Sequence, residues 1–472
     1  MSVINEYIFP MKMTHTLFNI MTIPPKTVST LLVCLFLLLG FSTYTQAAVS
    51  EDKIKELGTV LTPLGALKAA NKSKTIPQWS GDKKKADKIS ATLLSEKPLF
   101  IITQANLSQY EQHLTPGQKA LFENYPNTFR MPVYKSHRLH NVPESQYRAA
   151  RKNAAQATLI DEGNGFTNAW PGVPFPLAQN ALEVLWNHLT SWKGLHLKAN
   201  IIEAAIHTNG AVAKIINAVE LAMPYYEPTR EKLTSNSVLL YYMSKTLSPA
   251  RLAGGTTLSH NSTNPRLHPR KNWIYVAGQR RVRRLPAIGY DTPNMNSSHI
   301  RVVDEINLFN GSPDRYNWQL LGKKEIFIPY NNKALAQKIN SFDELLTPHH
   351  LNPETTRYEL HRVWVLDAKL KPTERHIYPH RVLYIDEDSW NAVIAEQYNR
   401  KDEIWRVTLS YSRYHEDLPG SLTVLDAFHD LKKKSYYVQS IYKKNSNPFN
   451  FLKELPNKKY FSPLELRRKS TQ

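Results

Sequence analysis

The chain has 472 residues and a formal net charge of +20 at pH 7, from 60 Lys and Arg against 40 Asp and Glu. A chain of this length can bury a large core of its own or form two domains, and its only cysteine, Cys34, excludes a fold held together by disulfides. In a cytosolic protein this charge would favour nucleic acid as a partner. In an exported protein it favours anionic lipid head groups or lipopolysaccharide, or a surface that is merely solvated.

Residues 1–47 have the parts of a secretory signal peptide. Two lysines precede an apolar run at 31–41, small residues follow it, and no acidic residue lies between Lys12 and Ala48. The run is shorter than the ~20 apolar residues that a membrane-spanning helix needs. We therefore expect cleavage near Ala47 and an exported mature chain at 48–472, although an uncleaved N-terminal anchor is the alternative. Because Cys34 would leave with the signal, the mature chain would have no thiol.

The first half of the chain is expected to be mainly helical. Thr62-Pro63 is a helix cap followed by proline at the first helical position. Leu182, Leu185 and Leu189 recur at helical spacing on one face. The predicted helices are 50–72, 103–113, 115–123, 143–156 and 181–192, the predicted strand is 98–102, and the lysine-rich stretch 73–97 is expected to wrap the surface.

From Leu195 onward the apolar pattern changes to period two, which is typical of strands. Asn209-Gly210 separates the first two stretches, and Asn-Gly is the strongest short hairpin signal. The predicted hairpins are 197–207 with 211–223, 238–247 with 251–259, and 273–276 with 279–285.

The clearest predicted sheet lies between residues 357 and 411. At 357–371 the even positions are apolar, Arg362 excepted, and the odd positions are largely polar, which predicts a strand with one dry and one wet face. The following strands are expected at 375–385, 390–398 and 403–411.

These patterns predict an α+β fold. It consists of one large curved antiparallel sheet with helices packed on its concave side and an N-terminal helical segment. The lack of strand–helix–strand alternation argues against a parallel nucleotide-binding sheet. We expect a single domain over 48–472, with a boundary near residue 340 as the alternative.

The common catalytic and metal-binding motifs are absent from the sequence. It has no G-x-S-x-G elbow, no H-E-x-x-H, no P-loop and no G-x-G-x-x-G. His376 and His380 would share a strand face but stand about 13 Å apart, too far for one zinc ion. The acidic run 386–388 falls between two strands and is predicted to be a polar turn. We expect no catalytic residue, cofactor or metal, and a metal site assembled from distant segments stays the alternative.

The densest basic cluster lies on the third predicted hairpin. On a strand, Arg281 and Arg283 face one way while Arg280 and Arg284 face the other, flanking Val282. One pair could bind phosphate oxygens bidentately, and the alternative is a solvated edge strand. The candidates for binding an anionic head group are Arg280, Arg281, Arg283, Arg284 and Arg362.

Nine Trp and 24 Tyr make the chain rich in large rings. Such rings, on the apolar side of a curved sheet, could line a cavity for a hydrophobic ligand, although they could equally fill an ordinary core. The candidates for lining a ligand cavity are Trp364, Trp390, Trp405, Leu360, Leu366, Val407 and Leu409.

Several long stretches resemble one protein family over nearly the whole mature chain. They include GVPFPLAQNALEVLWNH (172–188), GQRRVRRLPAIGYDTP (278–293), RYELHRVWVLDAKLKPTERHIYPHRVLYIDEDSW (357–390) and FSPLELRR (461–468). On these motifs the chain resembles domain-of-unknown-function family 1329, whose members are exported proteins of Gram-negative bacteria often labelled outer-membrane lipoprotein-sorting proteins.

The resemblance implies a fold like that of the Lol lipoprotein carriers, an incomplete β-barrel closed by helices around a hydrophobic cavity. It also implies a periplasmic location, association with RND-type exporters and an outer-membrane companion, and no assigned catalytic residues.

We therefore expect a periplasmic binding or carrier protein for a hydrophobic or lipid-like ligand, with peripheral membrane contact and no nucleic-acid partner. An envelope hydrolase and a non-binding structural adaptor of an export complex are the alternatives.

Overall fold

The computed structural model describes residues 49–234, 237–286, 289–337, 342–441 and 449–471. The predicted signal peptide and Cys34 lie outside these residues. No helix in the described part of the chain is both long enough and apolar enough to cross a membrane.

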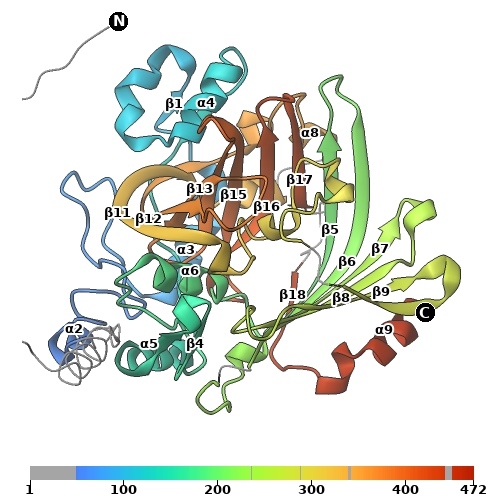
Figure 1. Ribbon diagram of the computed structural model, residues 1–472. Coiled ribbons are helices and arrows are strands. Elements are labelled where there is room, and N and C mark those ends of the chain that lie inside the picture. Colours follow the sequence, from blue (N-terminus) through green and yellow to red (C-terminus); the bar gives the residue numbers. More distant parts are fainter. Residues whose placement is uncertain (1–48, 235–236, 287–288, 338–341, 442–448, 472) are drawn as a thin grey trace, which may run out of the picture. The chain divides into compact units, whose positions relative to one another are not determined.

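One large open sheet runs through the described residues, and helices pack against it (Figure 1). Its strands are antiparallel neighbours, apart from a parallel contact between β2 and the start of β12. In spatial order they are β1 (Phe100–Ile102), β2 (Met131–Val133), β12 (Tyr358–Leu370), β13 (His380–Asp386), β14 (Ala392–Tyr398), β15 (Ile404–His415), β16 (Gly420–Asp430), β17 (Ser435–Ile441), β5 (His196–Ile206), β6 (Val212–Ala222), β7 (Val238–Ser248), β8 (Thr256–Ser262), β9 (Lys271–Val276) and β10 (Arg281–Leu285). In addition, β11 (Tyr316–Pro329) pairs with β12, and β18 (Phe449–Leu452) pairs with β5. The predicted α+β fold with a curved open sheet is confirmed.

The helices come mainly from the first half of the chain, as predicted. They are α2 (Glu51–Lys55), α3 (Lys83–Thr92), the 3-10 helix η2 (Gln104–His113), α4 (Pro116–Asn124), α5 (Glu144–Gln156), α6 (Ala181–Leu189), α7 (Lys333–Gln337), α8 (Phe342–Leu345) and α9 (Pro463–Thr471). A short separate hairpin, β3 (Thr158–Ile160) with β4 (Gly165–Thr167), precedes α6.

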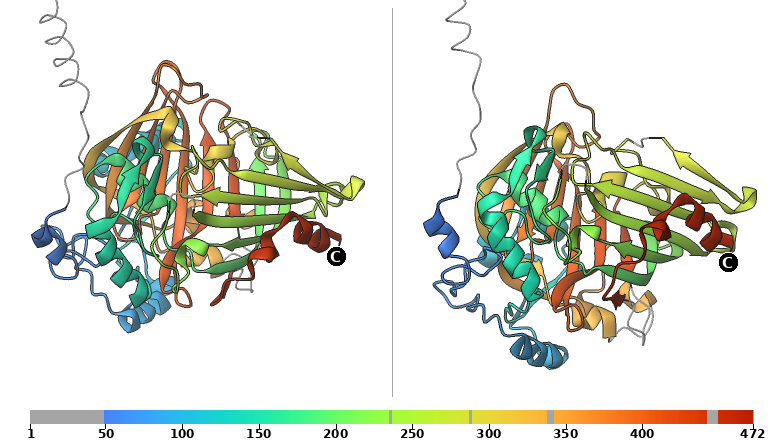
Figure 2. Two further views of the ribbon diagram at one scale, coloured as in Figure 1. Left: turned by 60° about the horizontal axis from the view of Figure 1, so that its bottom comes forward. Right: turned by 90° about the horizontal axis from the view of Figure 1, so that it is seen from below.

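Helix α6 packs on one face of the sheet, which we call the α6 face. Asn180 caps the helix by accepting a hydrogen bond from the Glu183 backbone N–H at 3.0 Å. Val184 and Leu185 lie in one apolar cluster with Leu366, Leu383 and Ile385 of the sheet. The views in Figure 2 show the segment that contains α5 and α6 lying along one side of the strands.

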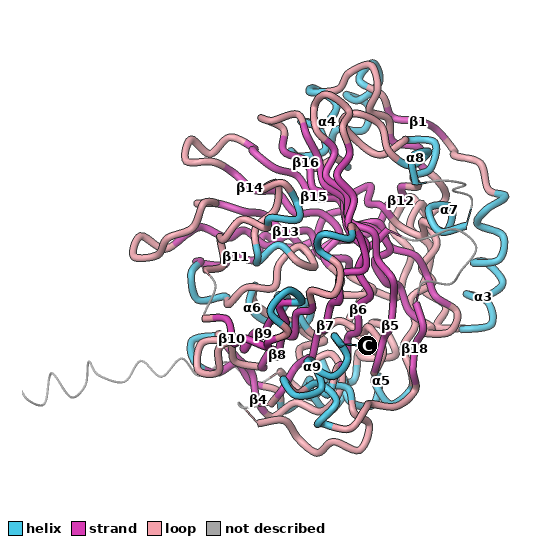
Figure 3. The backbone as a smooth tube through the Cα atoms, turned by 90° about the vertical axis from the view of Figure 1, so that its right-hand side faces the viewer, coloured by secondary structure: helices cyan, strands magenta, loops and turns pink. Residues whose placement is uncertain are grey.

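Helix α4 packs on the opposite face, which we call the α4 face (Figure 3). A capping box begins it, since the Thr115 side chain accepts from the Gln118 N–H and the Gln118 side chain accepts from the Thr115 N–H. Leu121 and Phe122 then cluster with Val407 and Leu409, whose strand positions alternate with those that face α6.

The predicted meander is confirmed, and it continues further than expected. Strands β12 to β15 follow one another through short turns, and β16 and β17 carry the sheet on to β5. The second strand begins at His380 rather than at residue 375, and the strand expected at 251–259 begins at Thr256. Strands β11 and β12, on either side of residue 340, are hydrogen-bonded neighbours.

Two local predictions are wrong. Most odd positions of β12 are buried, since Glu359 and His361 are 0% and 1% exposed and are hydrogen-bonded to each other, and only Lys369 near the strand end is exposed as predicted. The segment after Thr62 is not a helix. The Thr62 Oγ1 accepts a hydrogen bond from the Ala66 N–H in a turn. Gly65 has φ +94°, and a Cβ at this position would collide with the Pro176 carbonyl, so only glycine fits.

Candidate functional site

Trp364, in the middle of β12, packs against Trp390, which follows β13. The Trp364 and Trp390 rings stack with centroids 6.0 Å apart and an interplanar angle of 14°. Trp390 is fully buried, and its Nε1 donates to the Leu64 carbonyl at 3.0 Å. Leu366 belongs to the same cluster beneath α6. These three side chains form packed core on the α6 face.

The remaining predicted cavity residues lie elsewhere. Leu360, Val407 and Leu409 are buried in the large cluster that includes α4. The half-buried Trp405 ring contacts Tyr378 at 5.6 Å and the Arg406 guanidinium at 4.5 Å. The seven candidates are therefore not brought together around one hollow, and their role in ligand binding stays a prediction.

The four hairpin arginines lie at the edge of the sheet on and beside β10. All four are exposed, and Arg280 is in the turn before the strand, with φ +50°. Val282 packs toward the cluster that contains Leu466 of α9, so it is the only side chain in this run that faces the core. The structure thus places the arginines on an accessible, strongly basic edge.

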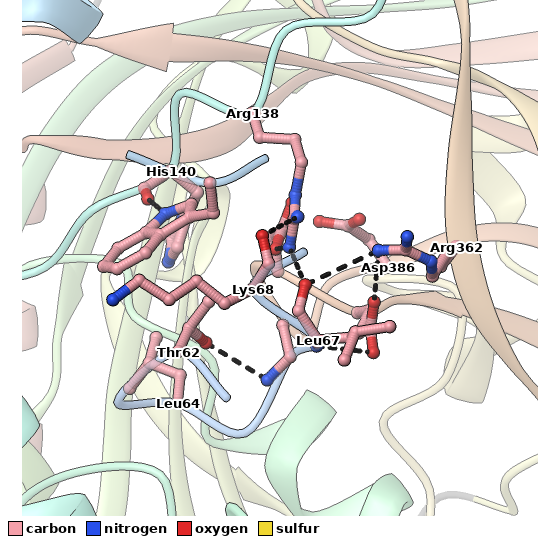
Figure 4. Close-up of polar contacts among 12 residues, drawn as sticks. Thr62, Leu64, Leu67, Lys68, Arg138, His140, Arg362 and Asp386 are labelled. Carbon is pink, nitrogen blue, oxygen red and sulfur yellow. Dashed lines mark hydrogen bonds and ion pairs between the residues drawn. The ribbon is translucent and has the colours of Figure 1, made fainter. Parts of the chain in front are cut away.

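Arg362, the fifth predicted head-group residue, is only 9% exposed and is already engaged. It donates to the Ala69 carbonyl at 3.1 Å, and its guanidinium lies 3.8 Å from the Glu387 carboxylate. Through the Ala69 carbonyl, Arg362 holds the N-terminal segment 61–69, part of which Figure 4 shows between Arg138 and Arg362. Its position is therefore that of an anchor for this segment.

Arg138 completes the attachment from the other side. It makes two hydrogen bonds to Asp388, at 2.8 and 2.6 Å, and one to the Leu67 carbonyl at 2.8 Å (Figure 4). The Leu67 N–H in turn donates to Glu387 at 2.9 Å. The acidic run predicted to be a turn does connect two strands, but it is buried and binds the N-terminal segment.

The anchor cluster, as we call this network, also contains the residues best placed to ligate a metal among those described. Ligand atoms of His361, Asp386 and Asp388 lie within 4.8 Å of one another. Arg138 holds the pKa of Asp388 below its usual value, whereas burial and the neighbouring Asp388 raise the pKa of Asp386.

Most carboxylates of this cluster face a cation. Asp388 pairs with Arg138, Glu387 with Lys323 and Arg362, and Glu359 with Arg357, while Glu96 and Glu325 also contact Arg357 and Arg362. Asp386 Oδ2 also accepts from the backbone N–H and the hydroxyl of Ser389. Since the carboxylates already face cations and hydrogen-bond donors, the arrangement stabilises the fold.

A cavity of about 220 Å³ lies between α6 and strands β6 to β8. Leu221 and Tyr242 are direct cross-strand partners, as are Tyr242 and Ser259, so the three side chains lie on one face of the sheet. Trp186 and Leu189 of α6 supply a second, apolar wall.

The segment 306–311 closes the cavity, and three contacts fix the chain around it. Asp304 pairs with Arg381 at 3.2 Å. Tyr378 donates to the Glu305 carboxylate at 3.1 Å. His188 of α6 donates from Nε2 to the Asn307 carbonyl at 2.9 Å, because its Nδ1 accepts from a strand N–H.

Partial burial in the cavity changes the acidity of two lining groups. Burial lowers the pKa of Lys193 to about 8 and raises that of Tyr242 to about 12, because each charged form would lose its hydration there. A wider, more open groove of about 640 Å³ adjoins the cavity, and Asn261, Ser262 and Arg270 line both.

Sequence reasoning missed these lining residues. Leu221, Leu240 and Tyr242 were correctly placed on strands by their alternation, which could have put them on one shared face. The covering segment 306–311 lies far from them along the chain and has no regular period, so nothing in the sequence pairs it with β6 and β7.

Comparison with known proteins identifies the family. The family model described as "Protein of unknown function (DUF1329)" matches residues 101–467. A Pseudomonas aeruginosa relative, "Uncharacterized protein PA3922", is 39% identical over 421 residues, which cover 87% of this chain and 92% of the relative. The chain belongs to the DUF1329 family. The predicted resemblance is thereby confirmed.

Solved structures that match part of this chain include a DUF1329 protein and a LolA superfamily protein. An outer membrane lipoprotein-sorting protein domain from Vibrio parahaemolyticus covers 61% of this chain and 98% of its own, with a TM-score of 0.41 and 14% identity. A DUF1329 protein from Desulfovibrio piger covers 58% and 92%, with a TM-score of 0.40 and 14% identity. The LolA superfamily protein NE2245 from Nitrosomonas europaea covers 60% and 98%, with a TM-score of 0.34 and 14% identity.

The stretches of sequence that carry the resemblance fall on elements of the anchor cluster, the α6 cavity and the basic edge. The motif at 172–188 includes most of α6, the motif at 357–390 spans β12, β13 and the anchor cluster, and the motif at 278–293 includes the arginines of β10. The motif at 461–468 opens α9, which packs on β8 to β10 through Leu466.

Proposed function

We propose that this DUF1329 protein is a cell-envelope binding or carrier protein for a hydrophobic, lipid-like ligand, and that the cavity beneath α6 is its binding site. The observation that carries the proposal is the cavity of about 220 Å³ bordered by Leu189, Leu221 and Leu240, because ligand sites are concave and largely apolar.

Binding in such a hollow would depend on burial of alkyl surface. Each buried methylene contributes about 0.8 kcal/mol, so affinity should rise with chain length until the hollow is filled. Contacts of this kind are undirected, so selectivity among apolar chains should be loose. At about 220 Å³, below the ~300–1,000 Å³ typical of ligand pockets, the cavity suits one alkyl chain rather than several.

The location and partners form part of the proposal. The predicted signal peptide and the family's labels support a periplasmic protein that works with an RND-type exporter and the outer membrane. The exposed arginines of β10, next to Arg467 and Arg468 of α9, would provide peripheral contact with an anionic membrane surface.

A filled-cavity variant tests the proposal. Leu240→Trp places a large ring in the hollow, whereas Leu247→Trp makes the same change on the same strand at a position that is 45% exposed. With N-phenyl-1-naphthylamine, a neutral apolar fluorophore, we expect the unaltered protein and Leu247→Trp to bind alike, and Leu240→Trp to bind at least ~10-fold more weakly, a loss of about 1.4 kcal/mol.

Thermal unfolding of both variants would verify that they fold. Equal binding by all three proteins would remove the cavity from the proposal. A complete lack of probe binding by the unaltered protein would argue against a carrier and favour a structural adaptor.

A further inference from the structure

The α6 cavity contains two cationic side chains that lack an acidic partner. Lys193 follows α6, and its Nζ donates to the hydroxyl and carbonyl of Ser191 at 2.6 and 3.4 Å. Arg270 donates from Nε to Asn261 Oδ1 at 2.5 Å and from Nη2 to the Asn310 carbonyl at 2.7 Å. Among the described residues, no carboxylate lies within 4.0 Å of either cation.

Four buried arginines elsewhere in the described residues pair closely with carboxylates, whereas the buried Arg301 lies over the Phe428 and Tyr437 rings instead. Arg138 meets Asp388, Arg357 meets Glu359, Arg381 meets Asp304 and Arg406 meets Asp430, all at 3.2 Å or less. Lys193 and Arg270 are half-buried and differ from these four pairs in having only neutral hydrogen-bond partners. Because both side chains line an apolar cavity, their charge would favour an anionic group on a ligand bound there.

The position of Arg270 indicates where that anion would lie. Its side chain lines both the apolar cavity and the wider groove, so it marks the junction between them. An amphiphile with its chain among Leu221, Leu240 and Leu189 would bring its head group to this junction. The Arg270 Nη1 group donates to no described residue, which leaves it able to bind a head-group oxygen.

We propose that the ligand of this cavity is an anionic single-chain amphiphile, with a carboxylate or phosphate head group bound by Arg270 and further attracted by Lys193. The inference rests on the proposed carrier function and adds the charge of the ligand and the residues that recognise it. A carboxylate would indicate a fatty acid, and a phosphate would indicate a product of phospholipid breakdown.

Competition by three ligands of equal chain length tests this inference. Dodecanoate, dodecyl phosphate and dodecanol displace N-phenyl-1-naphthylamine from the full-length protein, each measured below its critical micelle concentration. A charge-assisted hydrogen bond contributes enough that at least one anion should bind ~10- to 100-fold more tightly than the alcohol. The tighter of the two anions distinguishes the carboxylate source from the phosphate source.

Two variants assign the preference to its residues. Arg270→Gln should lower affinity for the preferred anion about 10-fold or more and leave dodecanol affinity within ~2-fold. Lys193 lines the cavity but not the groove that receives the head group. Lys193→Met should therefore lower anion affinity by a smaller factor than Arg270→Gln. Arg251→Gln is the matched control, because Arg251 is exposed and lines neither the cavity nor the groove, and it should have little effect on either ligand.

The outcomes separate this inference from the proposed function. Equal binding of the anions and dodecanol, or an equal loss of both in Arg270→Gln, would overturn the inference while the carrier function stands. If the unaltered protein binds neither the probe nor any of the three ligands, both the inference and the carrier function are overturned. Loss of folding in Arg270→Gln, seen by circular dichroism, would leave Lys193→Met to decide.

Discussion

The anchor cluster buries its arginines beside carboxylates, whereas the α6 cavity is lined by two half-buried cations. Arg138 has two hydrogen bonds to Asp388, and both side chains are at most 5% exposed. Lys193 and Arg270 instead have only neutral oxygen partners. The comparison teaches that a self-neutralised group of charges serves the fold, whereas uncompensated charge beside an empty apolar space points to a ligand.

The largest expected effect comes from breaking the anchor cluster. Asp388→Ala would leave the Arg138 guanidinium buried without its anion and release the segment 61–69, so the free energy of unfolding should fall by about 3–5 kcal/mol. Urea denaturation followed by circular dichroism measures it. Asp402→Ala is the control, because Asp402 pairs with His380 but its side chain is 70% exposed, and it should cost less than ~1 kcal/mol. Equal costs would show that the cluster is not an anchor.

A second pair of variants compares packed core with cavity lining. Leu383→Ala removes a fully buried side chain beneath α6 and should destabilise the protein by about 2–5 kcal/mol. Leu240→Ala enlarges a hollow that already exists, and should cost less than half as much because fewer packing contacts are lost. The difference in unfolding free energy is measured from the urea denaturation midpoints, provided that the slope of free energy against urea concentration is the same for all proteins. A larger loss for Leu240→Ala would mean that this hollow is closed by side chains in solution.

The smallest expected effect is a pH dependence of anion binding. Burial lowers the pKa of Lys193 from its ordinary value of 10.5 to about 8. Between these two pH values the folded protein binds fewer protons than the unfolded chain. The destabilising effect of the charged amine therefore fades as the pH rises through this range. A bound anion favours the protonated amine. Dodecanoate affinity should therefore decline about 2- to 5-fold as the pH rises from 7 to 9.5.

Calorimetric titration across this range, repeated with Lys193→Met, isolates the contribution of the amine. The variant should show a flat profile over the same range, since the Arg270 guanidinium stays charged throughout. An unchanged pH dependence in Lys193→Met would assign the decline to another group.

Much of the fold was predictable because the strands keep their period. The alternation in β12 to β15 predicted the meander, and Asn209-Gly210 correctly predicted the hairpin of β5 and β6. The extension through β16 and β17 is harder to predict, since Ser410, Asp426 and Gln439 occupy buried cross-strand positions and interrupt the expected apolar face. Period alone cannot distinguish a buried polar row from a solvated one.

The site was less predictable than the fold for a physical reason. A large ring is equally suited to filling space and to bordering it, and Trp364 and Trp390 fill it by stacking on each other. The hollow occurs instead where Leu221, Leu240 and the distant segment 306–311 fail to meet. Such a mismatch between segments is a property of the packed molecule and leaves no local pattern in the chain.

The most direct test of the ligand site is photo-crosslinking with a diazirine-labelled fatty acid, mapped by peptide mass spectrometry. The account predicts that adducts concentrate in the segments 186–193, 221–242 and 306–311, and that excess dodecanoate suppresses them. Adducts concentrated at Trp364, Trp390 and Trp405, or labelling that excess ligand does not reduce, would contradict it.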